Sequence, residues 1–263
     1  MRVVTWNVNG LRAAIRKGID EWFESVDAEI WMLQETRVLE EQFPKGWNWP
    51  STHQALLHPA EKKGYSGVAT MSSIDMIEER RGMISSIDSN DSEGRIIVTK
   101  HGKLTCINTY LPSGSNKDER QNFKEQWMDE WRTWLTPYLQ LNTPVLVVGD
   151  LNIAHTEDDI WNAKGNAKSS GFLPQEREWF SNLLGDGWHD LFREHVGEGV
   201  KLYSWWSNRG QARAKDRGWR IDYMLGNEAL MPFVETIRID RQGGLDISDH
   251  APVILDMNDG VTS

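Results

Sequence analysis

Cysteine is nearly absent from this chain, with one residue among 263. A single thiol excludes an intramolecular disulfide and a zinc site built from several thiolates. The sequence also lacks a long apolar run, and its first ten residues, MRVVTWNVNG, carry one positive charge and no stretch typical of a secretion signal or a membrane anchor. We therefore expect a cytosolic protein that does not bind membranes. Cys106 lies between β-favouring residues in LTCINTY, which favours a small buried residue over a redox centre.

Positive charge is scarce as well. The chain has 29 Lys and Arg residues against 39 Asp and Glu residues, a formal net charge of −10, and a uniformly negative surface repels polyanionic partners. The basic residues are unevenly spread, because Asn208–Arg220 holds five of them and one acidic residue. We interpret this segment as a candidate phosphate-binding loop. The alternative is a solvated basic loop on an acidic protein.

The remaining composition is that of a folded α/β protein. Hydrophobic residues make up 39% and charged residues 26% of the chain, which suits a sizeable buried core. Apolar or β-branched runs predict strands at Val3–Val8, Ile30–Leu33, Gly67–Met71, Arg95–Thr99, Leu104–Tyr110, Pro144–Val148, Ile221–Leu225, Val234–Ile239 and Pro252–Leu255. Helical patterns occur at Leu11–Phe23, Asp118–Leu139 and Gln175–Leu184, the last entered through Pro174. No linker-like stretch or repeat divides them, so we expect one layered domain over residues 1–263.

Polar signatures follow four of the predicted strands. They are Trp6-Asn7-Val8-Asn9-Gly10, Leu33-Gln34-Glu35-Thr36, Gly149-Asp150-Leu151-Asn152 and Ser248-Asp249-His250-Ala251-Pro252. Each alone fits a turn, but sites in layered α/β folds are built at strand ends, so their joint occurrence favours one shared site. Such a site would contain the oxygen donors Asn7, Glu35, Asp150, Asn152 and Asp249. Hard oxygen ligands suit Mg²⁺ or Mn²⁺ rather than zinc, and phosphate-ester chemistry is their natural use.

The sequence resembles the exonuclease III and abasic (AP) endonuclease branch of the endonuclease/exonuclease/phosphatase superfamily along nearly its whole length. The matching blocks, in the family's order, are WNVNGLRA at 6–13, LQET at 33–36, KGYSGVA at 63–69, NTYLPSG at 108–114, GDLNIAH at 149–155, SGFLPQEREW at 170–179, YSWWS at 203–207, GWRIDYML at 218–225 and SDHAP at 248–252. The resemblance implies an α/β fold in which two mixed β-sheets pack face to face between helices, a four-layer sandwich.

The resemblance also assigns roles to single residues. It implies a Mg²⁺ or Mn²⁺ site with Glu35 as the principal carboxylate, and its candidate ligands are Asn7, Glu35, Asp150, Asn152, Asp249 and His250. Asp150 would align or deprotonate the attacking water, and Asn152 would hydrogen-bond the phosphate. His250 would contact the scissile phosphate while Asp222 orients its ring. Tyr110 would donate to a phosphate oxygen or help stabilise the leaving group.

A pocket for a base-free sugar is the third element that the resemblance implies. Trp205, Trp219 and Ile221 match positions that line this pocket in the family, and Arg209 matches residues that push into the duplex. Ordinary core packing is the alternative for these side chains, as we expect for Trp127, Trp131 and Trp134, which recur at helical spacings. Asn116 departs from the pattern, because relatives often carry a basic residue there.

The expected activity is therefore hydrolysis of DNA 5′ to abasic sites, removal of nucleotides or blocking groups from 3′ ends, or both. The partner would be double-stranded DNA, Asn208–Arg220 would face it, and the protein would act as a monomer. Two alternatives stay open at this point. The chain could be another phosphodiesterase of the superfamily, such as a pancreatic-type deoxyribonuclease or an inositol-phosphate phosphatase, or a catalytically inactive DNA-binding protein.

Overall fold

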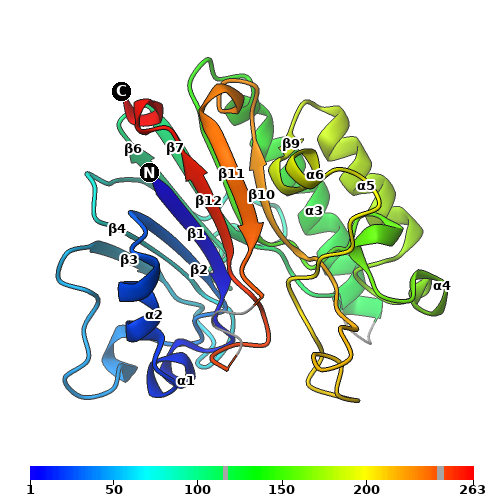
Figure 1. The fold of residues 1–263 in the computed structure, drawn as a ribbon, viewed down its shortest axis with the longest axis horizontal. Coiled ribbons are helices and arrows are strands. Elements are labelled where there is room, and N and C mark those ends of the chain that lie inside the picture. The colour runs from blue at the N-terminus through cyan, green and yellow to red at the C-terminus, as the bar shows by residue number, and fades with distance from the viewer. Residues whose placement is uncertain (115–117, 242–245) are drawn as a thin grey trace.

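Two six-stranded β-sheets pack face to face in the computed structural model, which describes residues 1–114, 118–241 and 246–263 (Figure 1). The first sheet has the order β11 (Val234–Ile239), β12 (Val253–Met257), β1 (Arg2–Asn7), β2 (Ile30–Gln34), β4 (Val68–Ser72) and β3 (Gln54–His58). The second has the order β5 (Ile77–Arg81), β6 (Ile96–His101), β7 (Leu104–Tyr110), β8 (Val145–Asp150), β10 (Asp222–Gly226) and β9 (His189–Asp190). The pairs β1–β2 and β7–β8 are parallel, and the other pairs are antiparallel.

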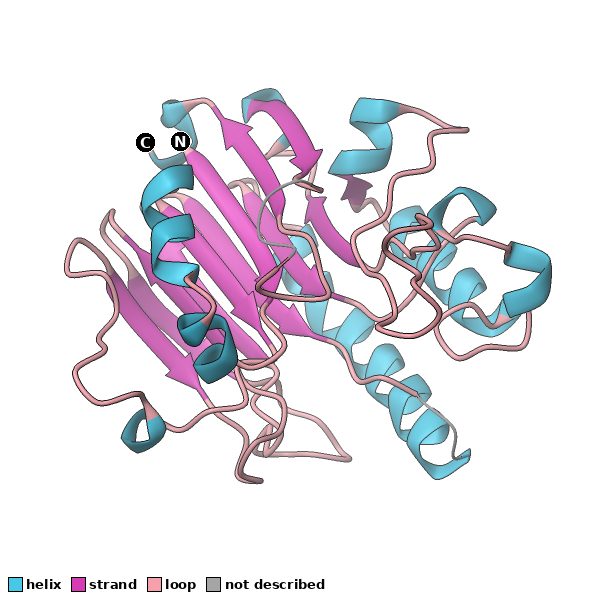
Figure 2. Ribbon diagram, turned by 60° about the horizontal axis from the view of Figure 1, so that its bottom comes forward, coloured by secondary structure: helices cyan, strands magenta, loops and turns pink. Residues whose placement is uncertain are grey.

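Helices cover the outer face of each sheet (Figure 2). The helices are α1 (Leu11–Arg16), α2 (Ile19–Val26), α3 (Asp118–Leu139), α4 (Ala163–Asn166), α5 (Pro174–Gly185) and α6 (Leu191–Val196). Leu11 and Phe23 pack with Val4 and Trp6 of β1 on the first sheet. On the second sheet, Trp127, Trp131 and Phe180 pack with Val145 and Val147 of β8. The arrangement is therefore the four-layer α/β sandwich that the resemblance implies.

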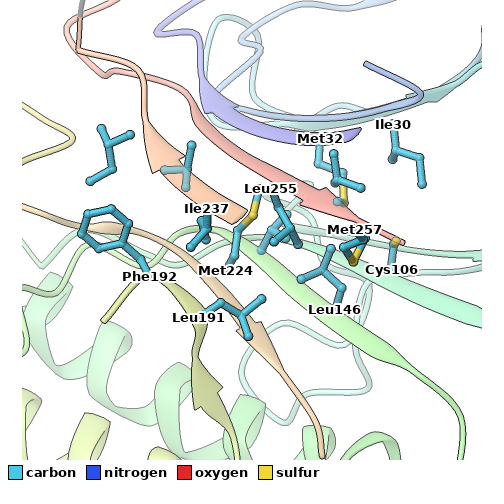
Figure 3. Close-up of a cluster of buried hydrophobic side chains, with 14 of the residues drawn as sticks. Ile30, Met32, Cys106, Leu146, Leu191, Phe192, Met224, Ile237, Leu255 and Met257 are labelled. Carbon is cyan, nitrogen blue, oxygen red and sulfur yellow. The ribbon is translucent and has the colours of Figure 1, made fainter. Parts of the chain in front are cut away.

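The space between the sheets is filled by side chains that alternate along each strand with those facing the helices. Val3 faces inward while its neighbour Val4 faces α1 and α2. Ile30, Met32 and Leu255 of the first sheet meet Leu146 and Met224 of the second (Figure 3). Cys106 belongs to the same cluster and is fully buried, which confirms its expected place in the core.

Two buried amides join the sheets close to their carboxyl-terminal ends. Gln34, the last residue of β2, donates from Nε2 to Asn108 Oδ1 of β7 at 2.8 Å. Asn108 in turn donates from Nδ2 to the carbonyl oxygen of Ala69 at 2.8 Å. Both side chains are fully buried, so each hydrogen bond would be costly to lose. These bonds fix one sheet against the other close to Glu35, which follows Gln34, and to Tyr110, which lies two residues after Asn108.

Some elements differ from the sequence prediction. The single helix predicted over Leu11–Phe23 is wrong, because Gly18 has φ 91° and separates α1 from α2. Strands β3, β5 and β9 were not predicted. The sequence of β5, IEERR, is exposed throughout and carries no apolar alternation. Trp127 and Trp131 are buried as expected, whereas Trp134 is half-buried against the same cluster. No helix of the described residues is long and apolar enough to cross a membrane.

We expect Gly149→Ala to destabilise the protein. Gly149 has φ +140° and lies opposite Thr109 in the parallel pair β7–β8, where an added Cβ would come within 1.8 Å of the Thr109 carbonyl oxygen. The strain and the clash should together cost at least about 2 kcal/mol of unfolding free energy, measured by urea denaturation. Gly185→Ala is the matched control, because nothing lies within 4 Å of its Cβ position. A Gly149→Ala variant as stable as this control would contradict the expectation.

Candidate active site

Three predicted site residues lie side by side at the ends of neighbouring strands in the second sheet. Tyr110, at the end of β7, pairs in register with Asp150, at the end of β8. Asp222 begins the antiparallel strand β10 and pairs with Asp150 from the other side. The three side chains thus follow directly from strand register.

The first sheet brings the other groups to the same place. Asn7 ends β1 opposite Gln34, so Glu35 follows immediately beside it. His250 precedes β12, and its carbonyl oxygen accepts a hydrogen bond from Trp6 Nε1 at 2.9 Å. Ser248 Oγ donates to the Asn7 carbonyl oxygen at 2.7 Å. Residues far apart in the sequence therefore converge between the two sheets.

A cleft of about 1030 Å³ opens above these strand ends. Ten of the predicted residues line it: Glu35, Tyr110, Asp150, Asn152, Trp205, Arg209, Trp219, Ile221, Asp249 and His250. The other two, Asn7 and Asp222, lie behind the wall with at most 2% of their surface exposed. They act on the cleft through the side chains that they contact.

Left-handed backbone conformations gather around the cleft. Asn9, Glu35, Arg37 and Asn152 all have φ between 46° and 56°. Residues other than glycine adopt this conformation at a cost and only when the surrounding structure holds them there. Here it turns four side chains away from their strand directions toward one cleft.

His250 lies between two carboxylates. Its Nδ1 is 2.9 Å from Asp222 Oδ2, and its Nε2 is 3.9 Å from Asp150 Oδ2. Burial favours the neutral imidazole, but the charge and the hydrogen bond of Asp222 outweigh it and raise the pKa of His250 to about 10. Ser204 Oγ donates to Asp222 at 2.6 Å and holds this carboxylate in place. The ring is therefore a fixed imidazolium with Nε2 directed to the side of Asp150.

The pKa of Asp150 is also raised, which for a carboxyl group favours the neutral form. Burial and the charge of Asp222 raise its pKa to about 7, against lowering by His250 and by the Asn7 amide. The backbone N–H of Asn152 also donates to Asp150 Oδ1 at 2.9 Å. A carboxylate with a pKa near neutrality can exchange a proton with water at little cost.

A second pair of carboxylates meets at the Asn7 amide. Its Nδ2 donates to Glu35 Oε2 at 2.9 Å and to Asp150 Oδ2 at 2.8 Å. Arg37 pairs with Glu35, and Asn9 Nδ2 donates to Asp249 Oδ1 at 2.8 Å. Carboxylates held this close to one another repel unless a cation or several donors balance them.

The donor chemistry of this cleft fits a hard divalent cation. Among the described residues, one ligand atom each from Asp150, Asp222 and His250 lie within 4.8 Å of one another. Glu35 and Asp249 add carboxylate oxygens to the same cleft. Oxygen-rich sites of this kind suit Mg²⁺ or Mn²⁺. Which of the predicted ligands bind an ion stays a prediction.

Tyr110 is 9% exposed and lines the cleft. Burial, followed by the charges of Glu35 and Asp150, raises the pKa of its phenol well above the ordinary value. The Arg95 guanidinium lies 4.9 Å from the centre of its ring, and Arg95 Nη1 donates to the Tyr110 carbonyl oxygen at 2.7 Å. The phenol therefore stays protonated and can act as a hydrogen-bond donor.

A buried ion pair between Lys124 and Glu176 fixes the backbone of Asn152. Lys124 Nζ donates to the Asn152 carbonyl oxygen at 2.9 Å and to Glu176 Oε1 at 2.6 Å. Both charged side chains are fully buried. The Asn152 amide itself donates to the Leu111 carbonyl oxygen at 2.9 Å. Helices α3 and α5 thus fix the strand end that carries Asp150 and Asn152.

The predicted sugar pocket forms one wall of the cleft. Trp205 and Trp219 meet edge to face with their ring centres 6.1 Å apart. Ile221 belongs to the apolar cluster against which both rings pack. Trp205 is bridged to His250 by backbone pairing, and its Nε1 donates to Asp249 at 3.2 Å. Trp205 and Trp219 are half-buried and Ile221 is buried, and this wall of the cleft lies beside His250. Its role as a sugar pocket stays a prediction.

The five basic residues of Asn208–Arg220 differ in exposure, and one of them, Arg213, is half-buried and donates to the Ser248 carbonyl oxygen at 2.7 Å. Arg209, Lys215 and Arg217 are exposed, as a phosphate-binding loop requires. The expectation is wrong for Arg220, which is fully buried. Its guanidinium donates to Asp159 at 2.6 Å and to Asp190 at 2.8 Å, and Arg193 completes this cluster by pairing with Asp159. Arg220 therefore anchors the pocket wall from behind. Asn116 lies outside the described residues.

Sequence reasoning missed several residues that contribute to the cleft. Asn9 belongs to the WNVNG signature and Arg37 directly follows LQET, so both were within reach of the motifs. Lys168 lines the cleft from a loop that carried no signal. Ser204 lies within YSWWS, but its hydrogen bond to Asp222 depends on a contact between segments 18 residues apart.

Comparisons with known proteins agree with this architecture. The Endonuclease/Exonuclease/phosphatase family matches residues 4–250. The exodeoxyribonuclease of Bacillus subtilis (strain 168) is 36% identical over 98% of this chain and 100% of its own length. The DNA repair nuclease APEX1 of Danio rerio is 35% identical over 97% of this chain and 81% of its own length. The 3′ phosphatase NExo from Neisseria, solved with a product DNA hairpin, has a TM-score of 0.87 and 25% identity, and the match covers 98% of this chain and 99% of that one.

We expect Asp222→Asn to lower the pKa of His250 in metal-free protein by roughly 1–3 units, because the opposing charge is lost. NMR titration of the imidazole proton would measure the shift. His101 is an internal control, because burial lowers its pKa to about 4 and Asp222 does not contact it.

The same change should alter how stability depends on pH. The raised pKa of His250 contributes stability that is fully present below pH 6.5 and is lost as the pH rises through about 10. The gap in unfolding free energy between wild type and Asp222→Asn should therefore narrow across this range. An unchanged pKa of His250 in the variant would show that Asp222 does not set its charge.

Proposed function

The chain belongs to the endonuclease/exonuclease/phosphatase family, within its exonuclease III and AP endonuclease branch, and from this premise we propose that it is a Mg²⁺-dependent DNA-repair phosphodiesterase. It hydrolyses DNA 5′ to abasic sites, removes nucleotides or blocking groups from 3′ ends, or does both. The observation that carries the proposal is that one cleft brings together a fixed imidazolium, several carboxylates and an aromatic wall. Asp222 contacts His250, and Trp205 contacts Asp249. The similar proteins support DNA as the partner, because they include a DNA repair nuclease and an exodeoxyribonuclease. The 3′ phosphatase NExo is solved with a product DNA hairpin.

Four side chains have separate roles in hydrolysis of a phosphodiester. The His250 imidazolium donates from Nε2 to a non-bridging phosphate oxygen, and Asp222 keeps its ring in position. Asp150 aligns the attacking water and accepts its proton, for which a pKa near 7 is well matched. The protonated Tyr110 phenol donates to phosphate oxygen, where it stabilises developing negative charge. Asn152 offers its amide to the same phosphate.

The residues that would hold the metal ion are the oxygen donors Asn7, Glu35, Asp150, Asn152 and Asp249. Glu35 is the principal carboxylate among them, and Asn7 keeps it close to Asp150. His250 is the sixth predicted ligand, and it could bind an ion only as a neutral imidazole, so as an imidazolium it contacts phosphate instead. When bound, Mg²⁺ neutralises phosphate charge and stabilises the departing oxyanion. Arg37 pairs with Glu35 and balances part of the negative charge of this carboxylate.

An abasic sugar is the substrate group that the aromatic wall fits. Extruding a nucleotide that has no base costs little stacking or pairing, and a pocket walled by Trp205, Trp219 and Ile221 has an apolar surface for the sugar beside the imidazolium. The exposed Arg209 at the cleft can enter the duplex that surrounds the extruded sugar. The cytosolic location and the monomeric state stay predictions.

A catalytically inactive DNA-binding protein is a weaker proposal. Asp150 and Asp222 are both at least 98% buried, next to each other, at strand ends. Burying neighbouring carboxylates is costly, and DNA binding alone gains nothing from it. Another phosphodiesterase of the superfamily would share these carboxylates, and the aromatic wall beside His250 favours the AP endonuclease branch.

We expect EDTA to abolish hydrolysis of an abasic duplex and Mg²⁺ or Mn²⁺ to restore it. Glu35→Gln should raise the Mg²⁺ concentration needed for half-maximal activity while leaving the melting temperature nearly unchanged, because Glu35 faces the cleft. Asp150→Asn serves as the inactive reference, with turnover lower by roughly 10²–10⁴-fold. Full turnover in excess chelator would rule out the metal-dependent mechanism.

We expect Trp219→Ala to reduce incision at an abasic site far more than removal of nucleotides from a frayed 3′ end, since only the first needs the extruded-sugar pocket. The assay compares both substrates in Mg²⁺, and the melting temperature is measured alongside. If the ring is ordinary core, the substitution should instead cost roughly 3–5 kcal/mol of stability and lower both activities in parallel. Parallel loss with a large melting shift would remove the pocket from the proposal.

A further inference from the structure

A large aromatic side chain outside the cleft has no role in the proposed chemistry. Trp161 keeps 39% of its surface exposed, although most Trp residues of the described chain are buried or half-buried. It lies between two segments that line the cleft. Lys168–Gly171 follow it through α4, and Trp219 lies across from its neighbour Ile160. In Figure 1, α4 lies at the edge of the molecule.

The backbone holds Trp161 firmly. Its N–H donates to the Gly218 carbonyl oxygen at 2.9 Å, and its own carbonyl oxygen accepts from Asn166 Nδ2 at 3.1 Å. Ile160 is fully buried in the apolar cluster behind the sugar pocket. Because successive side chains of an extended segment point to opposite sides, burial of Ile160 directs the Trp161 ring outward. The ring is thus presented by a fixed backbone that is shared with the pocket wall.

A guanidinium is stacked on this ring. Arg217 Cζ lies 4.5 Å from the centre of the Trp161 ring. Arg217 is exposed, and among the residues that the structure describes no carboxylate pairs with it. The positive charge is therefore available to an anion, while the rest of the indole is available for stacking.

Together these two side chains match one chemical class of ligand. Proteins bind unpaired nucleotides by stacking a base on an aromatic ring while a nearby cation contacts the phosphate. Lys168, which follows α4 in the chain, is a separate exposed cation that lines the cleft. On a chain with a net charge of −10, an exposed cation stacked on an indole favours a nucleotide, which offers both a base and a phosphate, over an acidic protein surface.

We propose that Trp161 and Arg217 form a stacking site for an unpaired nucleotide of the DNA substrate, next to the cleft. The base stacks on the Trp161 indole and the flanking phosphate contacts the Arg217 guanidinium. This inference rests on the proposed function, because it assumes that the cleft binds DNA. It adds a preference for DNA whose strands are separated beside the scissile position, such as frayed or forked ends.

The test measures binding of forked duplexes in EDTA, so that no cleavage occurs. One fork carries unpaired thymidine arms on both strands, and the other carries arms with the same number of phosphates made of propanediol spacers, which have neither a base nor a sugar ring. Wild type should bind the thymidine fork more tightly, and Trp161→Ala should reduce this preference about five-fold or more, whereas Trp161→Phe retains most of it. Arg217→Gln should weaken both forks alike and lower the salt dependence of binding by about one phosphate contact.

Leu141→Ala is the matched control, because Leu141 is 40% exposed and does not line the cleft. It should leave the preference for thymidine unchanged. A Trp161→Ala variant with the wild-type preference would overturn the stacking site. The proposed function fails by a different result, namely a wild-type protein that in Mg²⁺ neither incises a duplex with an abasic site nor removes nucleotides or blocking groups from a 3′ end. The two failures are therefore distinguishable.

Discussion

The hydrogen bond between Gln34 and Asn108 joins the two sheets where their strands end, and the geometry of the cleft depends on it. Each amide lies two residues or fewer before a group that faces the cleft, Glu35 in one sheet and Tyr110 in the other. A purely apolar interface would let the sheets slide by small amounts, since dispersion contacts are not directional. A buried hydrogen bond is directional, and leaving its donor or acceptor unpaired is costly. The bond therefore fixes how the carboxylates of the first sheet meet those of the second.

Once the sheets are fixed, electrostatics determines how each group can act. Two buried carboxylates, Asp150 and Asp222, lie in register on adjacent strands, and one imidazolium serves both. The closer contact, to Asp222, keeps His250 charged. Burial and the charge of Asp222 raise the pKa of Asp150 to about 7, although the more distant His250 lowers it. Two identical carboxyl groups thus have different environments, because Asp222 hydrogen-bonds the ring whereas Asp150 is buried beside a like charge.

Much of this was predictable from the sequence, because its strongest signals are burial and register. Strand Leu104–Tyr110 is buried at every position, and its predicted bounds agree with those observed, as do the bounds of helix Asp118–Leu139. Strand β5 was not predictable, because it is an edge strand held by backbone pairing with β6 and needs no apolar face. The strand-end motifs located residues that line the cleft, but the sequence could not show that Asp159 and Asp190 converge on Arg220. Long-range pairing of charges leaves no local pattern.

The buried charge cluster behind the aromatic wall of the cleft has a consequence for how this protein can change over evolutionary time. Arg193, Arg220, Asp159 and Asp190 form two positive and two negative charges in one place. Loss of any one member leaves an uncompensated buried charge, which is far more costly than replacing a whole pair by apolar residues. Arg220 stands between Trp219 and Ile221 in the sequence. Substitutions can therefore accumulate at Trp219 and Ile221, which face the cleft, while Arg220 stays paired with Asp159 and Asp190. Substrate preference could therefore diverge among descendants of this sequence without disturbing the scaffold, whereas the scaffold itself could change only by coordinated, paired substitutions.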